Sequence, residues 1–180
     1  CCASAAPAGP GGKKIGVDDW FAAGHTAAEF YTNRTVVHLM TQLLAPQAGE
    51  SIYDPTCGSG SLLLKAHDEA LGLTGVDLTI YGQEMDNATA ALARMNMILH
   101  DCPTAEIWKD NTLASPHFKA PDGSLKTFDY VVANPPFSNK NWTSGLDAAN
   151  DQYGRFEYGI PPDKNGDYAF LLHMLKSLKS

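Results

Sequence analysis

The chain has 180 residues, of which 44% are hydrophobic and 18% charged, a composition that is ordinary for one globular domain with a sizeable core. The formal net charge at pH 7 is −7, whereas a protein that grips nucleic acid by itself usually carries a basic face. The composition therefore argues against a stand-alone basic DNA-binding module. A role on DNA would need positive charge supplied by a partner.

The cysteine pattern predicts reduced thiols in a cytoplasmic protein. The four cysteines form no Cys-x-x-Cys pair, and the six histidines show no ligand spacing, so neither a metal site nor a disulfide framework is expected. No apolar run approaches the roughly 18 residues of a membrane span, so no membrane partner is expected. We interpret residues 1–17 as a flexible arm or an artificial boundary, and residues 18–180 as one domain.

A first amphipathic helix is predicted after Thr32 and Asn33. Both residues are good helix N-caps, and capping by itself accounts for them. The apolar residues that follow at helical spacing are Val36, Val37, Met40, Leu43 and Leu44.

The stretch from residue 51 to residue 61 predicts a strand, a glycine loop and the start of a helix. Gly58 and Gly60 let the backbone turn tightly and approach a ligand, and the helix N-terminus offers unpaired N–H groups. Asp54 ends the strand and suits a cationic or amine-bearing ligand better than a pyrophosphate. A lone Gly-x-Gly is a weak signal, so a tight turn without ligand remains the alternative.

The second predicted strand, residues 78–84, also ends in an acid. A carboxylate at this place is the usual way in which a Rossmann-like sheet holds ribose hydroxyls, so Glu84 is a candidate for that role. A helix follows, and its 3.6-residue periodicity predicts a buried face formed by Ala88, Ala91, Leu92, Met95, Ile98 and Leu99.

The third predicted strand, residues 105–111, ends in Asp110 and Asn111. These side chains either hydrogen-bond a purine edge or cap the turn into Thr112, and the sequence favours neither interpretation. Residues 115–127 are polar and contain glycine and proline, which indicates a loop or a short helix.

The fourth predicted strand, Phe128–Ala133, is apolar, aromatic and β-branched, which is typical of a buried strand. Two prolines end it abruptly. They make a stiff segment of backbone carbonyls without competing donors, so the Asn134 side-chain oxygen and the Pro135 carbonyl can aim at one point. An amino group with two hydrogens satisfies both acceptors and keeps its lone pair free for an electrophile.

Phe137 completes this Asn-Pro-Pro-Phe segment (residues 134–137) with a flat face on which a planar base can stack. Together these groups are the parts needed to alkylate an exocyclic amine. The alternative is a strand followed by a proline-rich turn, with Phe137 in the core.

The remainder of the chain predicts a long loop and a final helix. A long loop beside a site often gates it or meets a partner. Lys140 and Arg155 in this loop are interpreted as solvated surface charges, with phosphate contacts as the alternative. Gly166 and Asp167 are predicted to cap the helix, whose apolar and aromatic positions are Ala169, Phe170, Leu172, His173 and Leu175.

The recurrence of strands at intervals of about 25 to 30 residues, with helical patterns between them, predicts βαβ units and a mostly parallel sheet. Ligands of such α/β sheets lie across the carboxyl ends of the strands. Asp54, Glu84, Asp110 and Asn134, each at a predicted strand end, are therefore expected to converge on one edge.

Four segments together resemble the modification (M) subunit of type I restriction-modification systems, an N6-adenine DNA methyltransferase with a Rossmann-like catalytic domain. Residues 54–60 (Asp-Pro-Thr-Cys-Gly-Ser-Gly) are similar to that family's S-adenosylmethionine loop, and Gln83-Glu84 to its ribose-binding acid. Residues 134–137 resemble its catalytic motif, and residues 29–32 the segment that packs on the methionine end of the cofactor. The resemblance covers about residues 20–180.

Two substitutions and the length depart from the family pattern. Asn33 stands where proline is common and Ser61 where glycine is common. The family's N-terminal helical domain and the later strands of its sheet have no counterpart in these residues, so we expect a truncated methyltransferase domain with an incomplete base pocket.

The resemblance implies transfer of a methyl group from S-adenosylmethionine to N6 of an adenine flipped out of double-stranded DNA. The implied catalytic residues are Asn134, Pro135, Pro136 and Phe137. The implied cofactor contacts are Tyr31, Thr32, Asp54, Cys57, Gly58, Ser59, Gly60, Glu84, Asp110 and Asn111. A separate DNA-specificity subunit and a restriction subunit are the implied partners, in a hetero-oligomer.

Two other functions remain open at this stage. Related methyltransferases with a similar Asn-Pro-Pro motif methylate a glutamine amide of a protein, although Phe137 favours a base. The second alternative is a binding module that retains the fold but does not catalyse a reaction. Such a module would have no need of two aligned acceptors.

Overall fold

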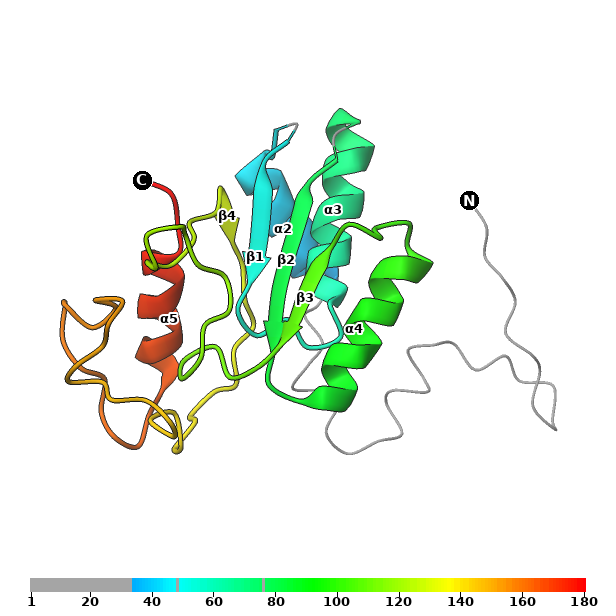
Figure 1. The fold of residues 1–180 in the computed structure, drawn as a ribbon. Coiled ribbons are helices and arrows are strands. Elements are labelled where there is room, and N and C mark those ends of the chain that lie inside the picture. Colours follow the sequence, from blue (N-terminus) through cyan, green and yellow to red (C-terminus); the bar gives the residue numbers. More distant parts are fainter. Residues whose placement is uncertain (1–33, 48, 76) are drawn as a thin grey trace, which may run out of the picture. The chain divides into compact units, whose positions relative to one another are not determined.

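The computed structural model describes residues 34–47, 49–75 and 77–180. The predictions for the N-terminal arm and for Tyr31, Thr32 and Asn33 lie outside the described residues. In the part that is described, strands and helices alternate along the chain, except that the last two strands follow one another without a helix between them (Figure 1). The helices are α2 (Arg34–Leu44), α3 (Ser61–Thr74), α4 (Asn87–Leu99) and α5 (Asp167–Lys176), and the strands are β1 (Ser51–Asp54), β2 (Thr79–Glu84), β3 (Glu106–Lys109) and β4 (Tyr130–Val131).

The four strands form one parallel sheet in the order β3-β2-β1-β4. Tyr53 of β1 lies opposite Tyr81 of β2 on one side and Val131 of β4 on the other. The carboxyl ends of β1, β2 and β3 lie at the lower edge of the sheet in Figure 1. The chain steps from β1 outward to β3 and then returns to place β4 on the other side of β1. The switch point, where ligands of open α/β sheets bind, therefore lies between β1 and β4.

Successive side chains of the central strands point to opposite faces of the sheet, and each face carries its own apolar layer. Ile52 and Ile80 face the first layer, a core that they share with Leu63 of α3 and Met97 of α4. Tyr53 and its neighbour Tyr81 face the opposite layer. There the Tyr53 ring stacks on Phe128, with ring centroids 4.5 Å apart, and meets Phe118 edge-on at 5.6 Å. Aromatic side chains from the 115–128 segment thus cover the sheet face that α3 and α4 leave uncovered.

The predicted buried face of α4 was wrong. Ala90, Ala93 and Met97 are the buried residues, whereas Met95, Ile98 and Leu99 are 52%, 65% and 70% exposed. Of the other predicted stripe residues, Ala88 and Ala91 are exposed and Leu92 is half-buried. The helix is apolar on more than one side, and small alanines allow a closer approach to the sheet and to the start of α3.

The fourth strand is shorter than the predicted Phe128–Ala133. Its first residue pairs elsewhere, because the Phe128 N–H donates to the Ser177 carbonyl at 2.9 Å and the Phe128 carbonyl accepts from Lys179 N at 2.9 Å. The Asp129 carboxylate then accepts from both the N–H and the hydroxyl of Ser51. Pairing with β1 begins only at Tyr130, which is half-buried because β4 is an edge strand of this sheet.

The long segment after residue 137 builds a second core on α5. Trp142 is 1% exposed and packs edge-on against Phe156, with ring centroids 5.7 Å apart. Both belong to a cluster that includes Leu113 and, from α5, Ala169 and Phe170. This segment is therefore a packed, turn-rich layer, and Trp142 has a structural role that the sequence did not assign.

The described helices include none with the length and apolar character that a membrane span requires. Likewise, residues 34–180 without 48 and 76 hold no group of three His, Cys, Asp or Glu side chains arranged to bind a metal ion. Cys57 and Cys102 are free thiols and both are buried.

Candidate functional site at the switch point of the sheet

The glycine loop (residues 55–60) and the Asn-Pro-Pro-Phe segment leave the sheet on the two sides of the switch point. The first follows β1 directly, and the second follows β4 after two residues. The Val132 N–H donates to the Tyr53 carbonyl at 2.9 Å, which extends the β1–β4 pairing to within two residues of Asn134. The two segments therefore start from neighbouring strands at the same edge.

Backbone and carboxylate contacts hold the glycine loop against the end of β2. The Cys57 N–H donates to the Gln83 carbonyl at 3.0 Å, and the Gly58 N–H donates to Glu84 Oε2 at 2.9 Å. The other oxygen of Glu84 accepts from Asp86 N at 2.9 Å. Glu84 is half-buried, so its carboxylate both anchors the loop and reaches the surface at the strand end.

Gly60 has the strictest requirement for glycine in this loop. Its φ is +77°, and a Cβ built on it lies 2.6 Å from Met97 Cε and 3.6 Å from Ala93 Cβ. We expect Gly60→Ala to lower the free energy of unfolding by roughly 1–2 kcal/mol, mainly through the left-handed backbone, because the Met97 methyl can move. Urea unfolding measures this.

The matched control is Gly72→Ala in α3. A Cβ there meets nothing within 4 Å, so the substitution is expected to raise stability by about 0.5–1 kcal/mol. Equal effects of the two alanines on stability would contradict the conformational requirement at Gly60.

Asp54 is a buried carboxyl at the end of β1, with 2% of its surface exposed. Its Oδ1 accepts from the Thr56 N–H at 2.8 Å. Burial, reinforced by repulsion from Glu84 and opposed by the Thr56 hydrogen bonds, raises the pKa of Asp54 from 3.8 to about 7. The group can therefore change charge near neutrality when a cation arrives beside it.

Asp110 and Asn111 follow β3 and are half-buried. The Asp110 N–H donates to the Glu84 carbonyl at 3.0 Å, which brings this turn beside the end of β2. Asn111 Oδ1 accepts from the N–H groups of Leu113 at 3.0 Å and Ala114 at 3.3 Å. This geometry is the turn-capping interpretation of Asn111, and its amide nitrogen has no hydrogen-bond partner in the described part of the chain.

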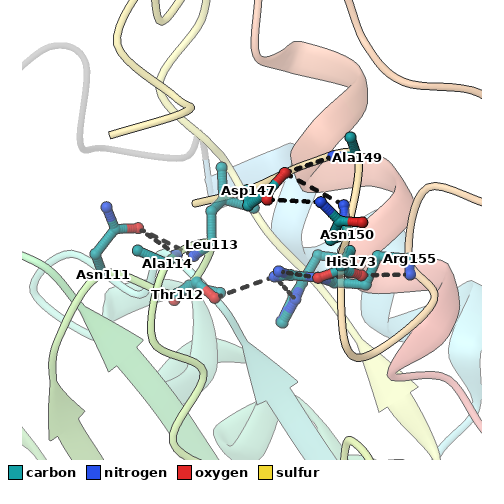
Figure 2. A network of polar contacts seen from close by, with 10 residues as sticks. Asn111, Thr112, Leu113, Ala114, Asp147, Ala149, Asn150, Arg155 and His173 are labelled. Atoms are coloured by element: carbon teal, nitrogen blue, oxygen red, sulfur yellow. Dashed lines mark hydrogen bonds and ion pairs between the residues drawn. The ribbon is translucent and has the colours of Figure 1, made fainter. Parts of the chain in front are cut away.

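A buried charged network contacts the turn that follows β3 through Thr112 (Figure 2). Arg155 is 2% exposed, and its NH2 donates to Asp151 Oδ1 at 2.7 Å. Its NH1 lies 3.5 Å from the Thr112 carbonyl, and the Thr112 hydroxyl donates to the Pro55 carbonyl of the glycine loop. The interpretation of Arg155 as a solvated or phosphate-binding charge was therefore wrong, whereas Lys140 is exposed.

His173 of α5 completes the network as a neutral imidazole. Burial and the adjacent positive charge of Arg155 lower the pKa of His173 to about 3. Its Nδ1 lies 3.4 Å from Arg155 NH1, a donor, so Nδ1 accepts and Nε2 carries the hydrogen. Nε2 then donates to the Tyr53 hydroxyl at 3.3 Å. The network therefore joins α5, the turn after β3 and the middle of β1.

The Asn-Pro-Pro-Phe segment becomes more exposed from its first residue to its last. Asn134 and Pro135 are half-buried, Pro136 is exposed, and Phe137 is 76% exposed, which rules out the core interpretation of that ring. Among the residues that the structure describes, the Asn134 side-chain amide has no hydrogen-bond partner. An amide without an internal partner, beside an exposed aromatic ring, is suited to meet a ligand.

The roles of two residues at the site were not predicted, because their partners are distant in the chain. Gln83 is 0% exposed, donates to the Ser115 carbonyl at 2.9 Å and accepts from the His117 N–H at 3.0 Å. Gly166 is the N-cap of α5, as predicted, whereas the Asp167 carboxylate accepts from the Ser138 N–H at 2.7 Å. A glutamine between the apolar residues of β2 and its terminal acid was a signal for a buried anchor. The sequence marks Asp167 only as the start of a helix, and no local signal indicates its contact with Ser138.

The profile of the family described as N-6 DNA Methylase matches residues 20–180. The chain belongs to this family. The type I restriction enzyme MjaIX methylase subunit of Methanocaldococcus jannaschii is 34% identical over 158 residues, which are 84% of this chain and 27% of that protein.

Solved structures agree with this membership. The methyltransferase subunit of a type I restriction-modification system from Streptococcus thermophilus superposes with a TM-score of 0.70 at 36% identity. The match covers 84% of this chain and 32% of that one. A SAM-dependent methyltransferase from Geobacter sulfurreducens, solved with S-adenosyl-L-homocysteine, is 12% identical with a TM-score of 0.51, over 88% of this chain and 49% of that one. This last likeness shows the fold alone.

As an N-6 DNA methylase family member, the chain has the predicted Rossmann-like methyltransferase fold with a mostly parallel sheet. It spans about a quarter to a third of the two type I subunits to which it is similar. In those relatives, the region that corresponds to this chain is therefore one part of a longer protein.

Proposed function

We propose that these residues form the catalytic part of a DNA adenine-N6 methyltransferase, the modification subunit of a type I restriction-modification system. One observation carries the proposal. The Asn134 amide, which has no internal partner within the described residues, and the exposed Phe137 ring flank the switch point opposite the glycine loop and the two acids Asp54 and Glu84. Family membership supplies the reaction class.

The cofactor in this proposal is S-adenosylmethionine, which supplies a methyl group on a sulfonium when bound. Glu84 is suited to accept from ribose hydroxyls, and Asp54 to face the positive end of the ligand. The glycine loop, with Cys57, Gly58, Ser59 and Gly60, lies between these two acids. Tyr31, Thr32, Asp110 and Asn111 are the remaining proposed contacts. The two acids and the loop fit a ligand that carries both hydroxyls and a cation.

For the reaction, the Asn134 oxygen and the Pro135 carbonyl each accept one N6 hydrogen of a flipped adenine stacked on Phe137. This arrangement keeps the nitrogen lone pair out of the ring system and directed at the methyl carbon. Bound S-adenosylmethionine would supply the methyl group to this nitrogen and leave as S-adenosylhomocysteine, and the extra N6 proton would pass to solvent. The chain contributes mainly positioning and electrostatic stabilisation.

The net charge of −7 supports a division of labour in which other subunits grip the DNA. We propose double-stranded DNA as substrate, a separate specificity subunit as the source of sequence choice, and a restriction subunit in the same cytoplasmic hetero-oligomer. Methyl transfer from labelled S-adenosylmethionine, measured for the full-length protein with its subunits, tests the proposal. Label in adenine N6 supports it, and label only in a protein glutamine would overturn it.

The raised pKa of Asp54 predicts pH-dependent cofactor binding. A cationic ligand favours the ionised carboxylate, which has lost its proton only above about pH 7. Binding at pH 6 must therefore release a proton, and linkage predicts an affinity about tenfold higher at pH 8 than at pH 6. Calorimetric titration at the two pH values measures this.

The matched variant Asp54→Asn keeps the size of the side chain and removes the titration. We expect weaker binding by this variant, with the pH dependence lost. Glu84→Ala is expected to weaken binding at every pH. A parent protein that binds equally well at pH 6 and pH 8 would count against a cation beside Asp54.

A further inference from the structure

The residue that follows Phe137 has an unusual backbone conformation. Ser138 has a φ of +54°, in the left-handed region that residues with a Cβ seldom occupy. Only two other non-glycine residues of the described part, Ala45 and Asp101, have positive φ. A conformation of this kind persists where the surroundings hold it, and such residues cluster at functional sites.

Two hydrogen bonds hold Ser138 and its neighbour to the start of α5. The Ser138 N–H donates to Asp167 Oδ1 at 2.7 Å, and the Gly166 N–H donates to the Asn139 carbonyl at 3.0 Å. The first is a charge-assisted bond, and it joins residues 29 positions apart in the sequence. We call this pair of contacts the Asp167 tether.

The anchor of the tether is rigid because it lies on the second core. A Cβ built on Gly166 would lie 2.5 Å from Trp142 Cβ, so the backbone of Gly166 rests directly on the buried indole. Trp142 Nε1 in turn donates to the Pro162 carbonyl at 3.0 Å. Asp167 begins α5, whose Phe170 is buried in the same cluster. The second core therefore holds the backbone that carries the Asp167 carboxylate.

Phe137, by contrast, has little that could orient its ring. The ring is 76% exposed and stacks on no other aromatic ring of the described residues. Its direction therefore depends on the backbone on either side. Pro135 and Pro136 stiffen the chain before it, and the Asp167 tether is what restrains the chain after it.

We infer that Asp167 is a positioning residue for the Asn-Pro-Pro-Phe segment: its carboxylate holds Ser138 in the left-handed conformation and so sets the direction of Phe137. The role rests on the proposed function only in assigning catalysis to that segment. An ordinary helix cap is a poor account of Asp167. Among the described residues its carboxylate accepts only from Ser138, which lies in another segment, and the α5 N-cap makes no side-chain hydrogen bond.

The test compares Asp167→Ala and Asp167→Asn in the full-length protein with its subunits. Alanine removes the acceptor, whereas asparagine keeps a side-chain oxygen in the same place. We expect Asp167→Ala to lower kcat for methyl transfer about 10- to 100-fold, with KM for S-adenosylmethionine and the thermal midpoint nearly unchanged, because a misaligned reacting group affects turnover more than cofactor binding. Asp167→Asn should recover most of the rate.

The matched control is Asp163→Ala, which removes an exposed acid from the loop that precedes α5. Asp163 has no partner within the described residues. Its kcat should equal that of the parent protein. An Asp167→Ala enzyme as fast as the parent would overturn the positioning role, as would an equal loss of rate in both aspartate variants. A loss confined to KM for the cofactor would also overturn it.

Hydrogen exchange of the Ser138 amide tests the tether independently of activity. A peptide spanning residues 134–140 suits this measurement, because Pro135 and Pro136 carry no amide hydrogen. Exchange should be slow in the parent and in Asp167→Asn, and faster in Asp167→Ala. If the parent transfers no methyl group while exchange follows this order, the proposed function fails and the tether stands. Unchanged protection in Asp167→Ala would refute the tether itself.

Discussion

Replacing Asn134 by alanine is expected to lower methyl transfer about 100- to 1,000-fold while affinity for S-adenosylmethionine changes less than about twofold. The size follows from losing one of the two preorganised acceptors that face the reacting nitrogen. Cofactor affinity should be kept because the glycine loop, Asp54 and Glu84 lie on the other side of the switch point. Single-turnover transfer of labelled methyl to DNA, with calorimetric titration of the cofactor, separates the two effects.

Two further variants make this result specific. Asn134→Asp keeps an acceptor oxygen but adds a charge, so it should retain more activity than alanine. Asn141→Ala removes an exposed asparagine from the following loop and should leave the rate unchanged. Equal transfer by the parent protein and Asn134→Ala would remove Asn134 from the reaction. Loss of cofactor binding in Asn134→Ala would instead give the residue a role in the cofactor pocket.

Arg155→Met is expected to lower the free energy of unfolding by about 3–5 kcal/mol. The side chains of Arg155 and Asp151 are only 1% and 4% exposed. Removing the guanidinium therefore leaves a buried carboxylate without its charged partner, although the backbone N–H at position 155 still donates to it. Urea unfolding at pH 7 gives the size of the effect. Lys176→Met is the matched control, because its ion pair with Glu157 is 40% and 50% exposed at 3.5 Å, and an exposed pair contributes less than about 1 kcal/mol.

The double variant Asp151→Leu/Arg155→Met separates the charge from the packing. Replacing both members by apolar side chains leaves no buried charge, so the double variant should be more stable than Arg155→Met alone. The coupling free energy measures the interaction between the two side chains. It is obtained from the parent, the single variants Asp151→Leu and Arg155→Met, and the double variant. A double variant less stable than Arg155→Met would mean that the Asp151 carboxylate contributes mainly by accepting from the Arg155 backbone N–H.

The same pair predicts how stability depends on pH. Burial raises the pKa of Asp151, but the hydrogen bonds and charge of Arg155 outweigh this effect and hold it below its ordinary value of 3.8. The contribution of the pair to stability is therefore complete above pH 3.8 and is lost as the pH falls through the lower, folded-state pKa. The stability difference between the parent and Arg155→Met should accordingly shrink only in strong acid.

The candidate site was predictable where its residues lie at the ends of elements with a clear period. The strands before Asp54, Glu84 and Asp110 and the helices after them follow from apolar runs, alternation and glycine positions, because these patterns act over a few neighbouring residues. A parallel sheet then places the strand ends at one edge. The resemblance carried by the motifs added the family, and the family match bears it out.

Long-range pairing limited what could be predicted. Nothing near Arg155 in the sequence indicates that a loop would bury it against Thr112 and His173. Similarly, α4 has apolar residues on more than one side, and only packing against the sheet selected the side with Ala93 and Met97. Phe128 left β4 because the chain after α5 offered it backbone partners.

The sequence by itself determined the α/β order of elements, the parallel sheet and the polar residues at its carboxyl edge, since these depend on local periodicity and on the rule that parallel strands end together. Only the tertiary structure decided which charges are buried and which segment Asp167 restrains. Those outcomes depend on contacts between residues far apart in the chain, whose burial and hydrogen bonds exist only once both partners are folded.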